Sequence, residues 1–277
     1  MKIGVLSGKG GAGKTFVATN LAYALKANTF IDCDIEEPNG HIFFGSPVDS
    51  EEKVQTLIPE VHIEKCNGCK KCVEFCQFNA LAYVKGKVLL FPELCHACGG
   101  CQMICPQHAI KEVPREIGVI EYGHDETLNL RTGRLHIGEA TGVPIVSRLL
   151  EDLLENQVSV IDCPPGSSCT VMESIRECDY CVLVVEPTIF GIHNVELIHE
   201  LVQLFHIPHG AVINKYFSEH DIGHAFCSER KIPVIGTIAF DELLGELIAN
   251  GVLASRYNKS YYQQFKDMGR RIKEALQ

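Results

Sequence analysis

Short apolar runs alternate with amphipathic stretches along most of this chain. Residues 2–6 form an apolar run, residues 14–25 carry apolar side chains at the spacing of one helix face, and residues 29–34 form a second apolar run. The order of strand, loop, helix and strand predicts an α/β fold, with a mostly parallel sheet flanked by helices.

The same alternation returns in the second half of the chain. Strands are expected at 158–162, 181–185, 210–213 and 234–238, and helices at 143–154, 195–205 and 259–276. The last helix is amphipathic, with Phe265, Met268, Ile272 and Leu276 at helical spacing. We expect these side chains to face a core, and a membrane-binding terminal helix is the less favoured alternative.

Between these two parts the periodicity breaks. From about residue 60 to 114, cysteine runs replace it, with one small hairpin expected at 81–90. Surface loops accept long insertions at modest entropic cost, so this stretch is interpreted as an inserted domain. The predicted organisation is therefore a first part of the α/β domain at 1–59, an insert at 60–114, and the second part at 115–277.

Composition and charge narrow the class of protein. The chain has 277 residues, of which 46% are hydrophobic, so it can build a proper core. Its formal net charge of −10 argues against a nucleic-acid partner, because the phosphate backbone requires a basic face. No apolar run is long enough to span a bilayer, and the first residues form a strand rather than a signal peptide. We therefore expect a cytoplasmic protein.

A glycine-rich loop joins the first strand to the first helix. It has the phosphate-loop pattern and consists of Gly8, Lys9, Gly10, Gly11, Ala12, Gly13, Lys14 and Thr15. Its backbone N–H groups and the following helix N-terminus suit an anion. Lys14 is expected to reach the β- and γ-phosphates of ATP or ADP, and Thr15 is expected to bind Mg²⁺.

Cysteines carry the second chemical signal. Eight of the fourteen cysteines fall in two runs. The first run is Cys66, Cys69, Cys72 and Cys76, and the second is Cys95, Cys98, Cys101 and Cys105. In two-cluster bacterial ferredoxins with this spacing, the fourth cysteine of each run ligates the other cluster. We therefore assign one [4Fe–4S] cluster to Cys66, Cys69, Cys72 and Cys105, and the other to Cys95, Cys98, Cys101 and Cys76.

The insert resembles such an α+β bacterial ferredoxin over its whole length. One departure is Gln77, which stands where the first run would usually have proline, whereas Pro106 keeps that feature in the second run. Structural zinc is the main alternative, since paired Cys-x2-Cys motifs also bind zinc. The third closely spaced cysteine of each run favours the clusters. His96, inside the second run, is expected to shape the cluster surroundings.

Six cysteines lie outside the runs: Cys33, Cys163, Cys169, Cys178, Cys181 and Cys227. Cys178 and Cys181 have metal-ligand spacing and could bridge a dimer interface. Because Cys181 opens an apolar strand, and buried cysteine behaves as a small hydrophobe, a structural role is favoured for both.

The loop and three other segments resemble one family. Lys-Gly-Gly-x-Gly-Lys-Thr is similar to the deviant Walker A motif of the MinD/ParA/Mrp ATPases, which include the nitrogenase iron protein. Residues 32–39 resemble the first switch of that family, residues 160–166 its second switch, and residues 213–215 its base-recognising segment.

This resemblance implies a nucleotide-dependent sandwich homodimer. By position, Lys9 would reach the partner's nucleotide, Asp34 would orient the attacking water, and Asp162 would bind Mg²⁺ through its water shell. Asn214 would contact adenine. For Asp32 two interpretations stay open, a switch residue or a strand-end carboxylate that caps the following loop. Cys169 follows the second switch, near where the nitrogenase iron protein holds its bridging cluster.

A nucleotide site and two cluster sites in one chain suggest three alternative functions. The first is an ATPase whose nucleotide state gates electron transfer through the clusters to an unknown redox partner protein. The second is an ATPase that assembles or carries iron–sulfur clusters, although the Cys-x2-Cys pair that Mrp-type carriers usually have near the C-terminal part has no match here. The third is a positioning ATPase whose clusters sense redox state.

Overall fold

The computed structural model describes the chain as two compact units. It covers residues 1–126, 128–217 and 222–277. The first unit comprises residues 1–51, 120–134 and 146–277, and the second comprises residues 52–119 and 135–145. Strands β3 (Val48–Val61) and β6 (Ile110–His124) carry the chain from the first unit into the second and back. The domain boundaries at 60 and 114 stay a prediction.

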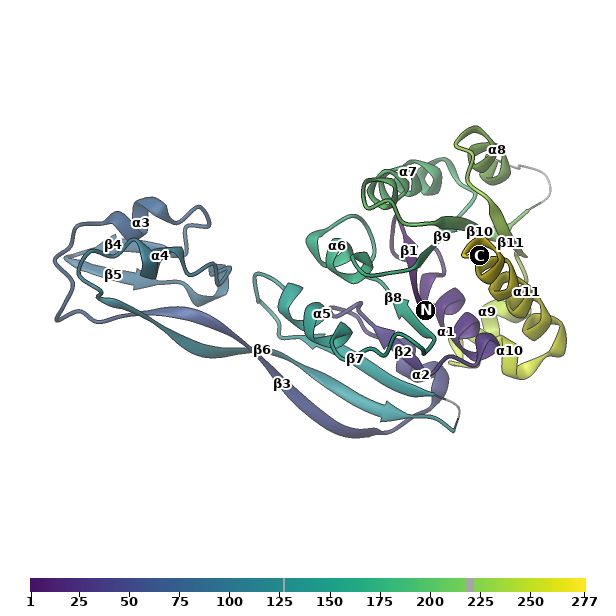
Figure 1. Ribbon diagram of the computed structural model, residues 1–277, viewed down its shortest axis with the longest axis horizontal. Helices are drawn as coiled ribbons and strands as arrows, with labels where there is room; N and C mark the ends of the chain where they lie inside the picture. Colours follow the sequence, from purple (N-terminus) through teal and green to yellow (C-terminus); the bar gives the residue numbers. More distant parts are fainter. Residues whose placement is uncertain (127, 218–221) are drawn as a thin grey trace. The chain divides into compact units, whose positions relative to one another are not determined.

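One large sheet runs through the first unit. In the described residues, nine strands follow the order β11-β10-β9-β1-β8-β2-β7-β6-β3 (Figure 1). Parallel pairing joins every neighbour from β11 to β7. The remaining bounds are β1 (Lys2–Ser7), β2 (Thr29–Asp32), β7 (Asn129–Leu135), β8 (Ser159–Asp162), β9 (Tyr180–Val185), β10 (His209–Tyr216) and β11 (Val234–Ala239). The predicted α/β class with a mostly parallel sheet is confirmed.

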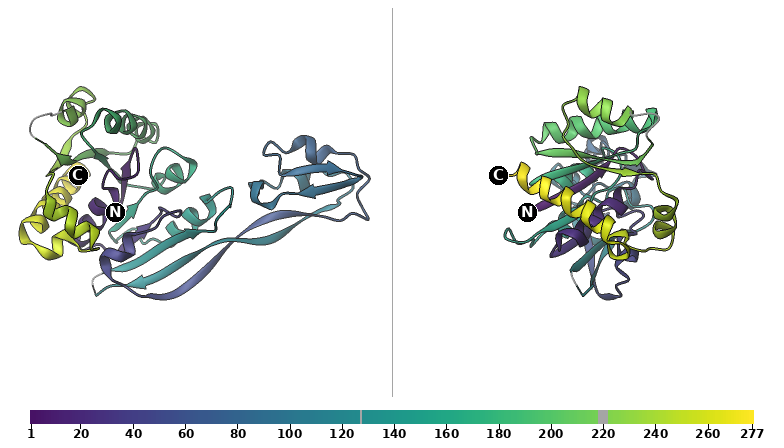
Figure 2. Two further views of the ribbon diagram at one scale, coloured as in Figure 1. Left: turned by 180° about the vertical axis from the view of Figure 1, so that it is seen from behind. Right: turned by 90° about the vertical axis from the view of Figure 1, so that its right-hand side faces the viewer.

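Helices cover both faces of this sheet (Figure 2). Their bounds are α1 (Lys14–Leu25), α2 (Gly40–Phe44), α5 (Val143–Leu150), α6 (Cys169–Ile175), α7 (Ile189–Leu204), α8 (Ile222–Glu229), α9 (Glu242–Ala249), α10 (Ala254–Tyr257) and α11 (Lys259–Ala275). The ring of Phe16 on α1 meets that of Phe265 on α11 edge-on, with centroids 5.7 Å apart. Both helices share one core cluster with Ile3 and Val5 of β1, whereas α8 packs on the opposite face, where Gly223 meets Ile213.

The terminal helix faces this core, as expected. Phe265, Met268 and Ile272 of α11 are buried, whereas Leu276 lies one residue beyond the helix and is partly exposed. Among the described residues, none of the helices combines the length and the apolar character needed to cross a bilayer.

Several boundaries differ from the prediction. The helix expected at 195–205 already begins at Ile189, and the strand expected at 210–213 continues to Tyr216. The helix expected at 143–154 ends at Leu150, and Leu154 is exposed, so its apolar side chain does not extend the buried stripe. The strand expected at 29–34 ends at Asp32, whose carboxylate accepts from the backbone N–H of Asp34 and so turns the chain.

The long strands β3 and β6 were missing from the prediction. Most residues of β3 are exposed or half-buried, so its sequence lacks the apolar alternation that marks a strand. In β6, Pro114 interrupts the pattern, and proline normally argues against a strand interior.

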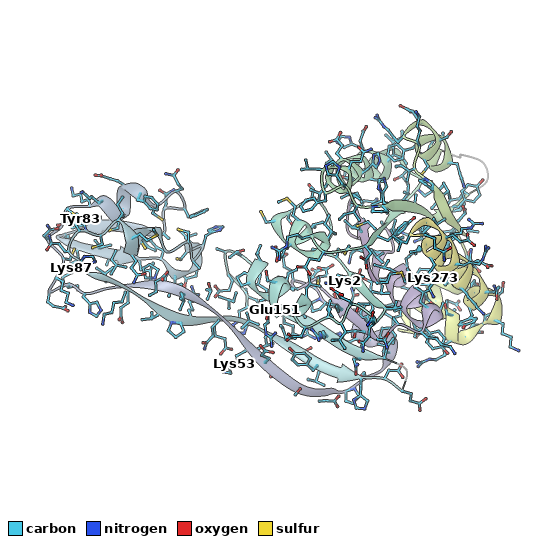
Figure 3. The ribbon with its side chains drawn as sticks, in the orientation of Figure 1. Lys2, Lys53, Tyr83, Lys87, Glu151 and Lys273 are labelled. Atoms are coloured by element: carbon cyan, nitrogen blue, oxygen red, sulfur yellow. The ribbon has the colours of Figure 1, made fainter. Side chains whose placement is uncertain are left out.

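The second unit is built around a small hairpin and short helices. Strands β4 (Leu81–Val84) and β5 (Lys87–Leu90) pair antiparallel, which confirms the predicted hairpin; Figure 3 labels Tyr83 and Lys87 on it. Lys85 and Gly86 both have positive φ, as a two-residue type I′ hairpin turn requires. The helices are α3 (Lys71–Phe75) and α4 (Gly100–Met103), and the core holds Cys72, Leu81, Val88 and Ile110. The resemblance to a ferredoxin stays a prediction.

Candidate functional site

The glycine-rich loop lies between β1 and α1, where the sequence placed it. Gly13 has φ +93°, and a Cβ there would lie 2.1 Å from Nδ2 of Asn214, so both conformation and space require glycine. Gly13 caps α1 without any side-chain hydrogen bond. The first N–H groups of the helix are therefore free of a side-chain cap, as an anion site needs.

Lys14 is held between two carboxylates. Its Nζ lies 2.7 Å from Oδ1 of Asp162 and 3.5 Å from Oδ2 of Asp34. Burial alone would lower the pKa of Lys14, but Asp162 and then Asp34 outweigh it and raise that pKa above its ordinary value. Burial raises the pKa of Asp34, and Lys14 opposes the rise. The structure thus brings together three residues that the sequence singled out separately.

Asp162 also offers an unused oxygen. Its side chain is fully buried, and its Oδ2 has no hydrogen-bond partner in the described part of the chain. A buried carboxylate oxygen without a donor is costly, so a ligand that supplies positive charge or water O–H groups fits here. Thr15 follows Lys14, whose Nζ contacts Asp162, directly in the chain, and it lines a cavity of the first unit. These oxygen donors suit Mg²⁺, which keeps several waters and binds few protein carboxylates.

Asp32 caps the loop that follows β2. Its fully buried carboxylate accepts hydrogen bonds from the backbone N–H groups of Asp34 at 3.1 Å, Asn39 at 3.0 Å and Gly40 at 2.8 Å. Burial and the neighbouring Asp162 raise the pKa of Asp32. The capping role is therefore the interpretation that the structure favours, and Asp32 supports the loop that carries Asp34.

Replacing Asp32 by alanine should destabilise the protein. The change leaves three backbone N–H groups without their acceptor, so we expect a loss of about 3 kcal/mol in the free energy of unfolding. Urea denaturation followed by circular dichroism measures it. Asp179→Ala is the matched control, because its exposed carboxylate also accepts from a backbone N–H, that of Lys2. Equal losses in both variants would contradict the capping role.

Lys9, the other lysine of the loop, forms an ion pair with Glu186. Nζ of Lys9 lies 2.5 Å from Oε2 of Glu186, at the end of β9, and Nζ of Lys215 lies 3.3 Å from Oε1 of the same carboxylate. Lys215 also donates to the carbonyl of Gly11 at 2.7 Å. Glu186 was not predicted, although a carboxylate directly after an apolar strand of a parallel sheet is a usable signal for a site residue.

Asn214 touches the loop from the end of β10. Its Nδ2 donates to the carbonyl oxygen of Ala12 at 2.8 Å, and its side chain is buried. This contact places the amide beside the phosphate loop. Its predicted contact with adenine stays a prediction.

One cavity of about 810 Å³ is lined by Lys14, Thr15, Asp34, Asn214 and Lys215, and all of its lining residues belong to the first unit. Its polar wall includes Gly10, Gly11, Gly13, Lys14, Thr15, Asp34 and Asn214, and its apolar wall includes Ile42, Phe43, Phe240, Leu244 and Ile248. Gly8, Lys9, Ala12 and Asp162 are not among the residues that line this cavity. The apolar wall was not predicted, because α2 and α9 were not among the expected helices and only the folded chain brings them to the phosphate loop. A large pocket with convergent polar groups is suited to a nucleotide.

The eight cysteines of the two runs line two further cavities in the second unit. One is lined by Cys66, Cys69, Cys72 and Cys105, and the other by Cys76, Cys95, Cys98 and Cys101. These are the two sets that the sequence analysis assigned, including the exchange of the fourth cysteine between runs. His96 lines the second cavity, and its ring stacks on Phe78 with centroids 3.8 Å apart.

The thiols line these cavities without meeting at a point. Across the described ranges, no three His, Cys, Asp or Glu side chains converge closely enough to hold one metal ion. A single zinc ion needs convergent ligands at about 2.3 Å. In a four-iron cluster, by contrast, the four thiolates bind at different irons around a larger body.

The other cysteines differ in exposure. Cys33, Cys163, Cys178, Cys181 and Cys227 are buried, and Cys169 is exposed at the start of α6. The sulfurs of Cys163, Cys178 and Cys181 gather around Gly4, within 3.6 Å of where its Cβ would be. Burial is the main cause that raises the pKa of the Cys163 thiol above its ordinary value. Their surroundings fit the structural role that the sequence favoured for Cys178 and Cys181.

Comparison with known proteins gives a family and a fold. Residues 3–254 match the CobQ/CobB/MinD/ParA nucleotide binding domain. Over its whole length the chain is 29% identical to an uncharacterized protein of Methanocaldococcus jannaschii and covers 98% of it. The septum site-determining protein MinD of Pyrococcus horikoshii, solved with Mg-ADP, has a TM-score of 0.63 at 16% identity, over 98% of this chain and 95% of that one.

A shorter match concerns an oxidoreductase. Over 46 residues the chain is 44% identical to one component of the ion-translocating oxidoreductase complex of Methanosarcina acetivorans. The match covers 17% of each chain, so it describes a segment and not the whole protein.

Proposed function

Because this chain belongs to the CobQ/CobB/MinD/ParA nucleotide-binding family, we propose that it is an ATPase whose nucleotide state governs electron transfer through two [4Fe–4S] clusters. The observation that carries the proposal is the pairing of two kinds of site in one chain. A phosphate-loop cavity lies in the first unit, and two cavities lined by four cysteines each lie in the second.

ATP binds in the cavity of the first unit. The loop N–H groups and Lys14 take the phosphates, while Thr15 and the free oxygen of Asp162 serve Mg²⁺ and its waters. Lys14 then exchanges its carboxylate partners for phosphate oxygens, which frees Asp34 to orient the attacking water. Mg²⁺ supplies charge neutralisation when bound.

Hydrolysis requires a second copy of the chain. Lys9 leaves Glu186 and reaches the nucleotide of the partner copy, where its charge stabilises the transferring phosphoryl group. Asn214 gives selectivity for adenine. The protein is therefore a nucleotide-dependent homodimer that works in the cytoplasm with a redox partner protein.

The second unit holds the clusters. Cys66, Cys69, Cys72 and Cys105 bind one, and Cys76, Cys95, Cys98 and Cys101 bind the other. When bound, such clusters accept and donate single electrons. The full set of eight ligands supports permanent clusters rather than delivery to other proteins.

The connections between the units support coupling. Ile42 and Phe43 of α2 line the nucleotide cavity, and the chain enters β3 only a few residues later. Residues 32–39, which resemble the first switch and are the segment most able to sense the γ-phosphate, thus come shortly before the strand that enters the second unit. Anaerobic purification, iron and sulfide quantitation and EPR spectroscopy with ATP and with ADP test the proposal.

A further inference from the structure

The two cysteine cavities of the second unit differ in charge. The first cysteine set is Cys66, Cys69, Cys72 and Cys105, and the second cysteine set is Cys76, Cys95, Cys98 and Cys101. Lys70 and Lys71 line the cavity of the first set, and no carboxylate of the described chain lines it. The described lining of the second cavity contains neither lysine, arginine nor carboxylate, and most of its other residues are apolar. Lysine charge is therefore placed at the first set alone.

Both lysines leave their charge available to an approaching molecule. They are exposed, and within the described ranges neither ammonium lies within ion-pair distance of an aspartate or a glutamate. The acidic residues nearest to them along the chain are Glu64 and Glu74, which line neither cysteine cavity. Glu64 lies 3.4 Å from His62. Exposed charges without a partner attract molecules of the opposite sign.

Local structure places these lysines beside an exposed cysteine. Lys70 has φ +63° and directly precedes α3, of which Lys71 is the first residue. Nζ of Lys70 lies 5.1 Å from the ring centroid of Tyr83 on the hairpin, a cation–π contact. Cys69, which comes directly before Lys70 in the chain, is the exposed member of the first set. An exposed cysteine and two exposed lysines thus line the same cavity.

The charge balance of the second unit allows these lysines to attract an acidic molecule. This unit has as many lysines and arginines as aspartates and glutamates, although the whole chain has a formal net charge of −10. The acidic excess therefore belongs to the first unit. Because the second unit is neutral as a whole, it does not repel an acidic molecule, and Lys70 and Lys71 direct that molecule to the first set.

We propose that Lys70 and Lys71 form the docking surface for an acidic electron-transfer protein, which exchanges electrons at the first cysteine set. The inference rests on the proposed function and identifies its redox partner by charge. Electron-transfer contacts are small and transient, and electrostatic attraction sets their rate of encounter. One electron passes from the partner's cofactor to the cluster of the first set. The partner is oxidised and the cluster is reduced by one unit, and no bond is made or broken.

Binding of an acidic [2Fe–2S] ferredoxin to the anaerobically purified full-length holoprotein tests the docking surface. Isothermal titration calorimetry at low ionic strength measures the Kd. Both proteins are kept oxidised, so no electron moves and a changed cluster potential cannot alter the result. Lys70→Gln/Lys71→Gln should bind about tenfold more weakly than the wild type, because two exposed charge pairs are lost. Added salt should weaken binding by the wild type more than binding by the variant.

Lys266→Gln/Lys273→Gln is the matched control. It removes the same charge from exposed positions on α11, in the first unit. Lys266 also matches Lys70 in its contact, because its Nζ lies 5.9 Å from the ring centroid of Tyr262. This control should bind the ferredoxin as tightly as the wild type does.

A kinetic readout separates docking from a change in reduction potential. Reduced ferredoxin should reduce Lys70→Gln/Lys71→Gln about tenfold more slowly than the wild type at low ionic strength. Reduced methyl viologen, a small cation that needs no docking surface, should reduce both at the same rate. Equal ferredoxin affinities of variant and wild type, equal weakening in the control, or no binding by a wild type with its full iron would overturn the inference. Absence of cluster iron from the wild type would instead overturn the proposed function.

Discussion

Lys14→Gln is expected to lower the rate of ATP hydrolysis by at least about a hundredfold, the loss typical when one pre-organised charge on a transferring group is removed. In the structure this ammonium is buried between Asp162 and Asp34, at the head of α1. The neutral amide keeps the size of the side chain but cannot offset the charge that develops on the phosphoryl oxygens. Phosphate release under saturating ATP and Mg²⁺ measures the rate.

Lys2→Gln is the control for this variant. It removes a lysine from the other end of β1, where the side chain pairs with the exposed carboxylate of Glu177. Its rate should match the wild type. Circular dichroism checks that both variants fold, because Lys14→Gln leaves two carboxylates without their cation. A Lys14→Gln rate within threefold of the wild type would show that the phosphate loop is not the hydrolytic site.

Cys105→Ala is expected to remove one whole cluster, so that iron falls from about eight to about four per chain. The residue belongs to the second run of the sequence but lines the cavity of the first three cysteines. Cys72→Ala should therefore abolish the same EPR signal as Cys105→Ala, and Cys76→Ala should abolish the other one. Iron quantitation and EPR of the dithionite-reduced protein provide the measurement.

Cys169→Ala is the matched control, since this cysteine is exposed and lies outside both runs. It should keep all the iron. If Cys105→Ala and Cys72→Ala removed different signals, the exchange of the fourth ligand between runs would be wrong. If neither variant lost iron, the cysteine sets would not hold clusters.

The sequence predicted the fully buried strands at the centre of the large sheet. Strands such as β9, with every residue buried, form continuous apolar runs in the sequence, and α1 follows its glycine loop directly. The exposed strand β3 and the proline-interrupted strand β6 left no such signal. Their pairing depends on neighbours that are distant along the chain, and single-strand periodicity cannot show them.

The candidate nucleotide site, like the fold, was predicted only in part. The phosphate-loop pattern predicted Lys14. The resemblance to the MinD/ParA/Mrp ATPases implied the roles of Asp34 and Asp162. Neither the pattern nor the resemblance could predict the apolar wall formed by α2 and α9, since that wall depends on tertiary packing.

The most direct test of the account is the EPR spectrum of the anaerobically purified, reduced protein, recorded with ATP and Mg²⁺ and again with ADP and Mg²⁺. Iron and sulfide are quantified on the same sample. We expect about eight irons per chain, two cluster signals, and a signal or potential that differs between the two nucleotides. Identical spectra and potentials with ATP and ADP, in a protein that carries its full iron, would contradict the coupling of nucleotide state to electron transfer.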